Sequence, residues 1–182
     1  MVIKTMETKK IELRNGGHVI VDSEDYEQLS AYAWRRDDHT RPNGSSVSYA
    51  TRFTKKDNGN HTRVYMHRQI MDTPKGTLTD HINHDGLDNR RANLRFCNHT
   101  QNQNNARPQK GRSSKWRGVT YYKKNRKFLS SLIYNKKRYY LGMNRSEGTM
   151  AMIWNAKAME LFGEFAYQNI SDSKINNVDS NS

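Results

Sequence analysis

A short stretch in the middle of the chain carries a carboxylate, an imidazole and two amides that could cleave a phosphodiester. Asp80 and His81 are adjacent, and Asn93 and Asn102 follow at intervals. Such cleavage needs an attacking water, a group that takes its proton, and positive charge on the developing phosphorane. An imidazole is a suitable base because its unperturbed pKa lies near neutrality. Side chains alternate along a strand, so Asp80 should face away from His81 and hold a hard cation there.

The two amides have different expected roles. Asn93 lies in the segment Arg-Ala-Asn-Leu-Arg, where its amide can tie the loop to the strand and fix the approach of His81. The side-chain oxygen of Asn102 could complete the metal site. His84 and His99 are expected to be solvated or to face phosphates, and His67 either is structural or touches DNA.

Residues 61–105 resemble the ββα-metal module of HNH endonucleases, in the form whose last histidine is replaced by asparagine. The resemblance rests on Asp80-His81, Asn93 and Asn102, and on the flanks Met66-His67-Arg68 and Asp88-Asn89-Arg90. It implies that His81 is the general base, that Asp80 and Asn102 bind the metal, and that Asn93 is architectural. It also implies a helix over residues 98–105. An amide at position 102 favours Mg²⁺ or Mn²⁺ over zinc.

The elements that must position this site begin with a hairpin. Residues 10–13 and 18–21 flank Asn15-Gly16-Gly17, a turn signal, and a helix should follow the capping residues Asp22–Asp25. Residues 37–46 are polar and predict a loop. Residues 47–53 and 62–71 predict two strands that lead into the Asp80-His81 strand.

The charge is concentrated in the last third of the chain. The net charge is +13, and residues 106–170 hold 14 Lys and Arg against 3 Asp and Glu. Residues 1–105 hold 16 against 13. This asymmetry indicates a nucleic-acid-binding surface in the C-terminal part. Hydrophobic residues make up 34%, which is too few for a large core, and the single cysteine excludes a Cys-rich zinc site.

Residues 114–169 predict three short strands, at 116–122, 127–134 and 138–141, and a helix capped by Ser146 and ended by Gly163. They resemble the Apetala or ethylene-response-factor DNA-binding domain, which implies that the sheet enters the major groove with a helix behind it. The residues expected to contact DNA come from this sheet and from the basic linker before it. They are Arg107, Lys110, Arg112, Lys115, Arg117, Lys127, Arg138 and Tyr140. The linker charges are alternatively a solvated tether.

The expected fold class is α+β, with five parts: a β-rich lobe (1–60), the HNH nuclease module (61–105), a basic linker (106–113), the Apetala-like domain (114–170) and a disordered tail (171–182). The expected function is Mg²⁺- or Mn²⁺-dependent cleavage of duplex DNA at a preferred site, by an HNH homing endonuclease of the phage or intron-encoded type. It would act as a monomer or as a homodimer on DNA. The alternatives are a catalytically inactive DNA-binding regulator and a protein that binds or cuts RNA. No membrane segment, signal peptide or structural zinc is expected, so the protein should stay in the cytoplasm of the host cell.

Overall fold

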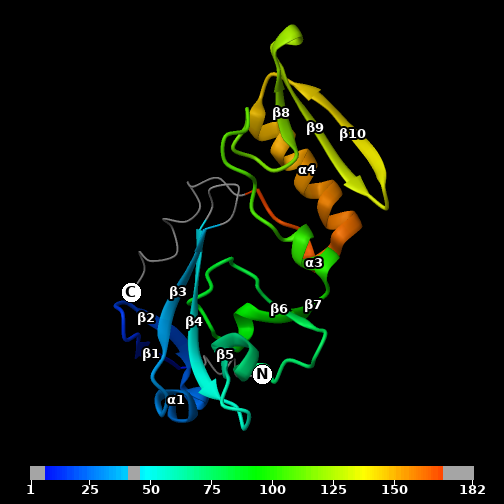
Figure 1. Ribbon diagram of the computed structural model, residues 1–182. Helices are drawn as coiled ribbons and strands as arrows, with labels where there is room; N and C mark the ends of the chain where they lie inside the picture. Colours follow the sequence, from blue (N-terminus) through cyan, green and yellow to red (C-terminus); the bar gives the residue numbers. More distant parts are fainter. Residues whose placement is uncertain (1–6, 41–45, 170–182) are drawn as a thin grey trace, which may run out of the picture. The chain divides into compact units, whose positions relative to one another are not determined.

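The computed structural model describes residues 7–40 and 46–169. The chain divides into two compact units, residues 1–102 (unit 1) and 103–182 (unit 2), and the division falls within a short helix. Each unit combines small antiparallel sheets with helices, so the chain is α+β as predicted (Figure 1). The tail for which disorder was predicted lies outside the described residues. In the described part of the chain, no helix has the length and apolar character needed to cross a membrane.

Unit 1 opens with the predicted hairpin and helix. Strands β1 (Thr8–Glu12) and β2 (His18–Asp22) pair antiparallel, with Ile11 opposite Val19. Gly16 and Gly17 both adopt positive φ, which an L side chain rarely takes, and this allows the tight turn. Helix α1 (Ser23–Ser30) follows directly.

A three-stranded sheet follows, and here two predictions were wrong. Strands β3 (Arg35–Thr40), β4 (Ser46–Lys55) and β5 (His61–Tyr65) lie in the order β3-β4-β5. Residues 37–40 are therefore a strand and not a loop, because they pair with β4 in continuous register. Residues 66–70 form helix α2 (Met66–Ile70) and not a strand. Met66 and Ile70, one helical turn apart, are both buried in the core.

The region expected to be catalytic is a strand pair followed by a helix. Strands β6 (Leu78–His81) and β7 (Leu94–Cys97) pair antiparallel, with a short 3₁₀ turn, η1 (Arg91–Asn93), just before β7. Helix α3 (His99–Asn104) begins after Asn98, whose Oδ1 accepts a hydrogen bond from the Gln101 backbone N–H at 2.9 Å. This cap satisfies a donor at the helix start. The expected helix is present.

The core of unit 1 draws on every part of the unit. Trp34 is fully buried, and its Nε1 donates to the Leu29 carbonyl at 2.8 Å, closing the end of α1. The other buried members come from the hairpin, α1, β4, α2 and β7; they are Ile11, Leu13, Val19, Val21, Leu29, Ala50, Met66, Ile70 and Leu94. The hairpin and the three-stranded sheet are thus packed into one body with β6–β7.

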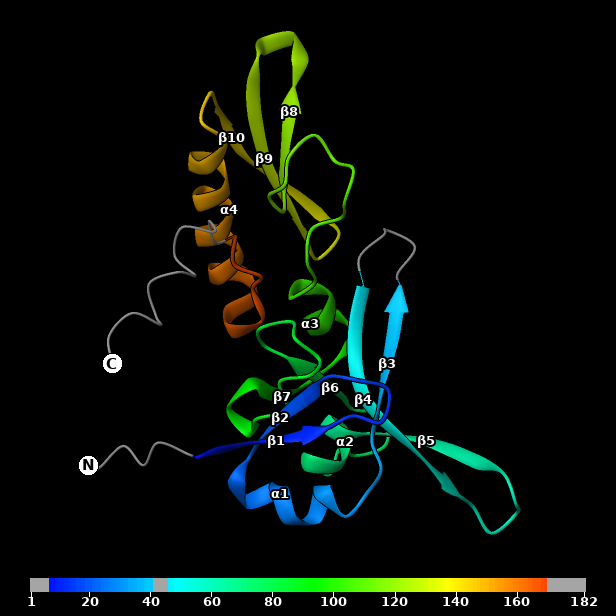
Figure 2. The same cartoon turned by 90° about the vertical axis from the view of Figure 1, so that its left-hand side faces the viewer.

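Unit 2 is a three-stranded sheet with one long helix against one face (Figure 2). Its elements are β8 (Val119–Tyr122), the 3₁₀ turn η2 (Lys123–Asn125), β9 (Lys127–Tyr134), β10 (Lys137–Asn144), α4 (Glu147–Phe162) and the 3₁₀ turn η3 (Gly163–Phe165). The Ser146 hydroxyl accepts from the Thr149 N–H, and Gly163 ends the helix, as predicted. The first strand starts at 119 and not at 116, because Gly118 has a φ of 73°. Trp154 and Leu132 lie at the centre of the helix–sheet core.

Candidate active site and nucleic-acid interface

His81 lies at the end of β6 inside an aromatic cluster. It is buried, and its ring centroid lies 4.9 Å from that of His67 and 5.9 Å from that of Tyr49. Tyr49 comes from β4, and Tyr65, at the end of β5, lies 5.5 Å from His67. The three-stranded sheet therefore forms one wall of the environment of His81.

A second contact determines which nitrogen of His81 can act as a base. The Nε2 atom lies 3.4 Å from Oδ1 of Asn89, a fully buried residue. Asn89 Nδ2 donates to the Gly86 carbonyl at 3.2 Å, which directs the amide oxygen toward the histidine. An amide oxygen can only accept, so this contact is a hydrogen bond in the tautomer that carries the proton on Nε2. In that tautomer the lone pair of neutral His81 is on Nδ1.

Burial lowers the pKa of His81, and the hydrogen bond with Asn89 acts in the opposite direction. The net lowering keeps the imidazole neutral near pH 7. A neutral imidazole has a free lone pair, which is the state required of a general base.

Asp80 faces the other side of the β6–β7 ribbon. It is buried and pairs in register with Arg95, whose Nη2 lies 3.0 Å from the Asp80 Oδ2. Both side chains are about one-tenth exposed. The carboxylate is thus held in place beside a guanidinium, and a cation bound there would share it with Arg95.

Asn93 ties the loop between β6 and β7 to the strand end. Its Oδ1 accepts from the Asn83 backbone N–H at 3.0 Å, and its Nδ2 donates to the Asn83 side chain and to the Asp88 carbonyl. Its own carbonyl accepts from the Ile82 N–H at 2.9 Å. Asn93 is therefore positioned to shape the loop beside His81 rather than to contact a substrate.

The same loop is clamped to the hairpin and α1. The Ile20 N–H donates to the Leu87 carbonyl, and the Asn89 N–H donates to the Ile20 carbonyl at 2.8 Å. Arg91 forms a bidentate pair with the buried Asp25, at 2.7 and 2.9 Å, and its backbone N–H donates to the Asp22 carboxylate. The capping carboxylate expected at the start of α1 is thus used to fix this loop.

Asn102 lies on α3, the helix that follows β7, and it is exposed. Its backbone N–H donates to the Asn98 carbonyl within the helix. The strand–strand–helix order connects it to Asp80 through β7, but no direct contact joins the two side chains in the described structure. Among the described residues, no group of three or more His, Cys, Asp or Glu side chains is arranged to hold a metal ion.

Sequence reasoning missed Tyr49 and Asn89 and left His67 open. His67 is buried, its Nδ1 has no hydrogen-bond partner, and burial lowers its pKa to about 3. Tyr49 also lies against the loop between β6 and β7, because a Cβ added to Gly86 would lie 2.7 Å from the Tyr49 ring. Asn89 lies in a flank that was part of the resemblance, so the sequence pointed to its neighbourhood. No motif in the sequence includes Tyr49.

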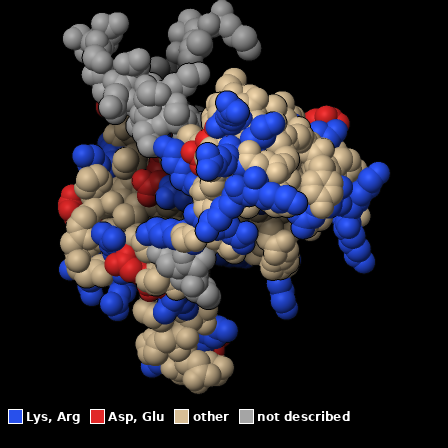
Figure 3. All heavy atoms as spheres, turned by 90° about the horizontal axis from the view of Figure 1, so that it is seen from above, with Lys and Arg blue, Asp and Glu red and all other residues tan. Residues whose placement is uncertain are grey.

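The outer face of the unit 2 sheet is basic and aromatic. The inner side chains of β9 pack on α4, while Ile133 and Tyr140 on the opposite face are 56% and 72% exposed. Lys127 and Arg138 are exposed on that same face, where register places Arg138 opposite Ile133. Lys and Arg greatly exceed Asp and Glu on the molecular face shown in Figure 3.

The segment before β8 borders the same sheet face. A hollow of about 480 Å³ is lined by Arg107, Arg112 and Arg138, together with Thr120, Ser131 and Ile133. Lys110 and Lys115 are exposed, and the Lys115 ammonium lies 4.7 Å from the Trp116 ring. Basic side chains of the linker and of the sheet therefore share one surface within unit 2.

Arg117 has a structural environment. Its Nη1 donates to the Asn104 carbonyl at 2.8 Å and its Nη2 to the Gln103 carbonyl at 2.9 Å. Burial lowers its pKa, and the guanidinium also lies 5.4 Å from the Trp154 ring. These contacts hold the end of α3 against the unit 2 core, so this cation is less available to DNA than its sheet neighbours.

One curated protein is similar to this chain. It is named uncharacterized HNH endonuclease L560, from Acanthamoeba polyphaga mimivirus, and it is 35% identical over 99 residues. The match covers 54% of this chain and 50% of the relative, so the chain spans about half the relative's length. The similarity supports an HNH nuclease family. No family model matches the chain. No solved structure matches it either, and nothing in these comparisons supports the Apetala-like assignment.

Proposed function

We propose that the chain is a metal-dependent DNA endonuclease of the HNH homing type, which hydrolyses phosphodiester bonds in duplex DNA at a preferred site. The observation that carries the proposal is His81: a buried, neutral imidazole next to Asp80, with Nε2 directed at Asn89. The strand–strand–helix order around it and the similarity to a viral HNH protein support the same function.

In this proposal one atom takes the proton from the water. Nδ1 of His81 accepts the proton of the attacking water, and the imidazolium that forms keeps its Nε2–H directed at the Asn89 amide oxygen. Asn93 holds the loop that carries Asn83 and Asp88. The side chains of this loop are thus fixed before DNA arrives.

Asp80 and Asn102 would hold the metal ion. Both offer oxygen atoms, which Mg²⁺ and Mn²⁺ prefer, and such ions commonly keep several waters and need few protein ligands. When bound, the ion supplies positive charge for the developing phosphorane and the leaving oxygen. The pair with Arg95 holds the Asp80 carboxylate in one orientation.

Unit 2 would supply affinity and register on the duplex. Its exposed Lys127, Arg138 and Tyr140, and the cations at 107, 110, 112 and 115, suit phosphates and base edges. One site per chain predicts a nick in one strand, so a double-strand break would require a second chain or a second binding event.

The test is conversion of supercoiled plasmid to open circles in the presence of Mg²⁺ or Mn²⁺. His81→Ala should slow conversion at least about 100-fold, the usual contribution of a general base, while DNA binding stays unchanged. His18→Ala, which replaces an exposed histidine at the start of β2, is the matched control. If the native protein binds duplex DNA but never nicks it, the chain is a DNA-binding regulator instead. A preference for RNA over duplex DNA at matched salt would favour a ribonucleic acid partner.

A further inference from the structure

Unit 1 contains a hollow that lies outside the proposed active site. It has a volume of about 440 Å³ and is lined by Arg14 and Asn15 in the hairpin turn, Tyr32 and Arg35 in the segment after α1, and Arg52 and Phe53 on β4. Three of these residues are cationic, two are aromatic, and no carboxylate lines the hollow.

The cations of this hollow are not neutralised. Within the described residues, Arg14 and Arg35 are exposed and form no ion pair with a carboxylate. Asp25 pairs with Arg91 and Asp37 with Arg63, and neither carboxylate lines the hollow. The near balance of charge over residues 1–105 therefore conceals a local excess of positive charge at this surface.

The aromatic side of the hollow is already ordered. The Arg52 guanidinium lies 4.0 Å from the centroid of the Tyr32 ring, and its Nη2 donates to Gln69 Oε1 at 3.0 Å. Tyr32 meets Trp34 edge to face at 6.3 Å, yet remains 42% exposed. The Tyr32 ring is thus held in place with part of its surface open to solvent.

The walls are fixed to one another as well. The Arg14 N–H donates to the Trp34 carbonyl at 2.9 Å. Asn15 accepts from the Arg36 N–H at 2.7 Å and donates to the Arg36 carbonyl at 2.9 Å. These bonds attach the hairpin turn to the start of β3. The hollow is therefore formed before any ligand binds, which reduces the cost of ordering on binding.

We propose that this hollow binds an unpaired nucleotide segment of DNA, with phosphates on Arg14 and Arg35 and a base against Tyr32. The proposal rests on the proposed function, which makes DNA the substrate. Arginine pairs well with phosphate, and an exposed ring offers a surface on which a base stacks. In a duplex both faces of a base are stacked on its neighbours, so only an unpaired base can use the ring.

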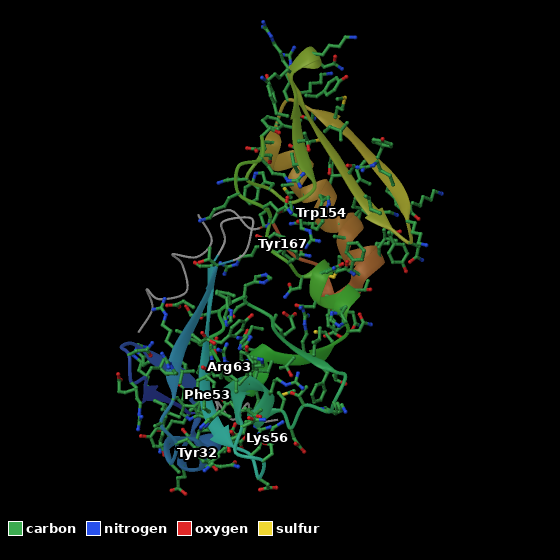
Figure 4. All side chains as sticks on the ribbon, viewed as in Figure 1. Tyr32, Phe53, Lys56, Arg63, Trp154 and Tyr167 are labelled. Atoms are coloured by element: carbon green, nitrogen blue, oxygen red, sulfur yellow. The ribbon has the colours of Figure 1, made fainter. Side chains whose placement is uncertain are left out.

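Nearby basic and aromatic residues extend this surface beyond the hollow. Phe53 is 49% exposed, and the Arg63 guanidinium lies 5.5 Å from its ring. Lys55 and Lys56 are exposed at the turn between β4 and β5. Figure 4 labels Tyr32, Phe53, Lys56 and Arg63 in this part of unit 1. A strand several nucleotides long would thus meet further cations and a second ring.

The first experiment measures binding of a fluorescein-labelled 12-nucleotide oligothymidylate to the full chain by fluorescence anisotropy. Arg14→Ala combined with Arg35→Ala should weaken binding about 10-fold or more. It should also reduce the salt slope by about 1.4, because each phosphate contact on a single strand contributes about 0.7. The control, Lys10→Ala with Lys75→Ala, removes two exposed charges of unit 1 that do not line the hollow, and it should reduce binding much less. Equal losses in the two double variants would overturn the proposal.

The second experiment places the base. Tyr32→Leu should weaken binding about 5- to 150-fold, the range measured for loss of one stacked base, while Tyr32→Phe should bind as the native chain does. An oligothymidylate carrying one 5-iodouracil should crosslink, on irradiation, to the peptide that contains Tyr32. Crosslinks confined to unit 2, or tighter binding of oligouridylate than of oligothymidylate, would contradict the proposal.

Plasmid nicking measured in parallel separates the two proposals. If the native chain nicks plasmid and the double arginine variant binds the oligonucleotide like the control, the hollow proposal fails and the nuclease proposal stands. If the native chain never nicks but the variant loses oligonucleotide binding, the nuclease proposal fails and the hollow remains a DNA site.

Discussion

Asn89 has an environment in which its amide can be oriented in only one way. The Gly86 carbonyl takes one of its N–H groups, so the oxygen must face His81. An exposed amide would rotate and exchange partners with water, whereas this one is fully buried. In the proposed mechanism Asn89 therefore orients the His81 imidazole, as groups that support a catalytic imidazole commonly do.

Asn89→Ala should lower kcat for nicking about 10-fold and leave KM nearly unchanged, because the variant loses the fixed tautomer but no contact with DNA. Single-turnover nicking and anisotropy with duplex DNA measure the two effects separately. Asn125→Ala, at an exposed turn of unit 2, serves as the control. A rise in KM with constant kcat would indicate that Asn89 contributes to binding instead.

His67 makes folding depend on pH. Burial lowers its pKa to about 3 from the ordinary 6.5, so between these values the unfolded chain binds a proton that the folded chain does not. The contribution of neutral His67 to the free energy of unfolding is therefore fully present above pH 6.5. It decreases as the pH falls toward 3, by at most about 1.4 kcal/mol per pH unit for one proton. His67→Phe should make this dependence shallower in urea unfolding at pH 4, 5, 6 and 7. His61→Phe, at an exposed position, should leave it unchanged. Parallel slopes for all three proteins would mean that His67 titrates normally in the folded state.

At the scale of elements, the loop between β6 and β7 is positioned by the hairpin and α1. Arg91 joins the loop to Asp25 and Asp22 across 66 to 69 residues of sequence. Because Asp25 is buried, removal of its partner leaves a charge without compensation. The N-terminal elements thus stabilise the loop of the proposed active site, although no proposed catalytic side chain comes from them.

Arg91→Met should lower the free energy of unfolding of unit 1 by about 1–3 kcal/mol, the usual cost of losing hydrogen bonds to a charged group. Hydrogen exchange should quicken at Asn89 and Asn93, whose backbone bonds hold the loop. Arg68→Met, which removes a bond from a different arginine of unit 1 to the Thr77 carbonyl, is the comparison. If both variants exchange alike in the loop, the clamp is not specific to Arg91.

Alanine substitutions at two glycines of unit 2 can distinguish backbone strain from a steric clash. Gly118 has a φ of 73°, and an added Cβ would overlap the Trp154 indole, whereas Gly142 has a φ of 118° and open space around it. Gly142→Ala should cost about 1–2 kcal/mol from the backbone alone. Gly118→Ala should cost clearly more, since the helix–sheet core must shift. Thermal unfolding of both variants measures this difference. If the two variants lose the same amount of stability, Trp154 does not pack against Gly118 as closely as in the structure.

Local signals explain which elements could be predicted. Asn15-Gly16-Gly17 marked the hairpin, and Ser146 and Gly163 marked the ends of α4. In contrast, β3 is polar throughout, and its strand state comes from pairing with β4, which no local pattern reveals. The same holds for the site. The spacing of Asp80, His81 and Asn93 was readable, but the roles of Tyr49, Asn89 and Asp25 depend on contacts between distant segments.

At the scale of the whole molecule, the two units carry their cations differently. Residues 1–105 carry 16 cations against 13 acids, while residues 106–170 carry 14 against 3. Under the proposed function, long-range attraction to DNA therefore depends mainly on unit 2, while the proposed catalytic residues lie in unit 1. Affinity and chemistry should consequently respond to different substitutions.

This separation predicts a change in salt dependence without a change in the chemical step. Lys127→Ala combined with Arg138→Ala removes two exposed cations from the outer sheet face. The slope of log K against log salt for duplex DNA should then fall by about 1.8, because each phosphate contact contributes about 0.9. Anisotropy at several salt concentrations measures the slope, and single-turnover nicking at saturating protein should retain the native rate. Lys157→Ala removes a cation that is paired with Glu160 on α4 and should leave the slope nearly unchanged. A slope unaffected by the double variant would move the duplex-binding surface away from the unit 2 sheet. A slower saturating rate would mean that this sheet also positions the scissile phosphate, so that binding and chemistry are coupled through the DNA.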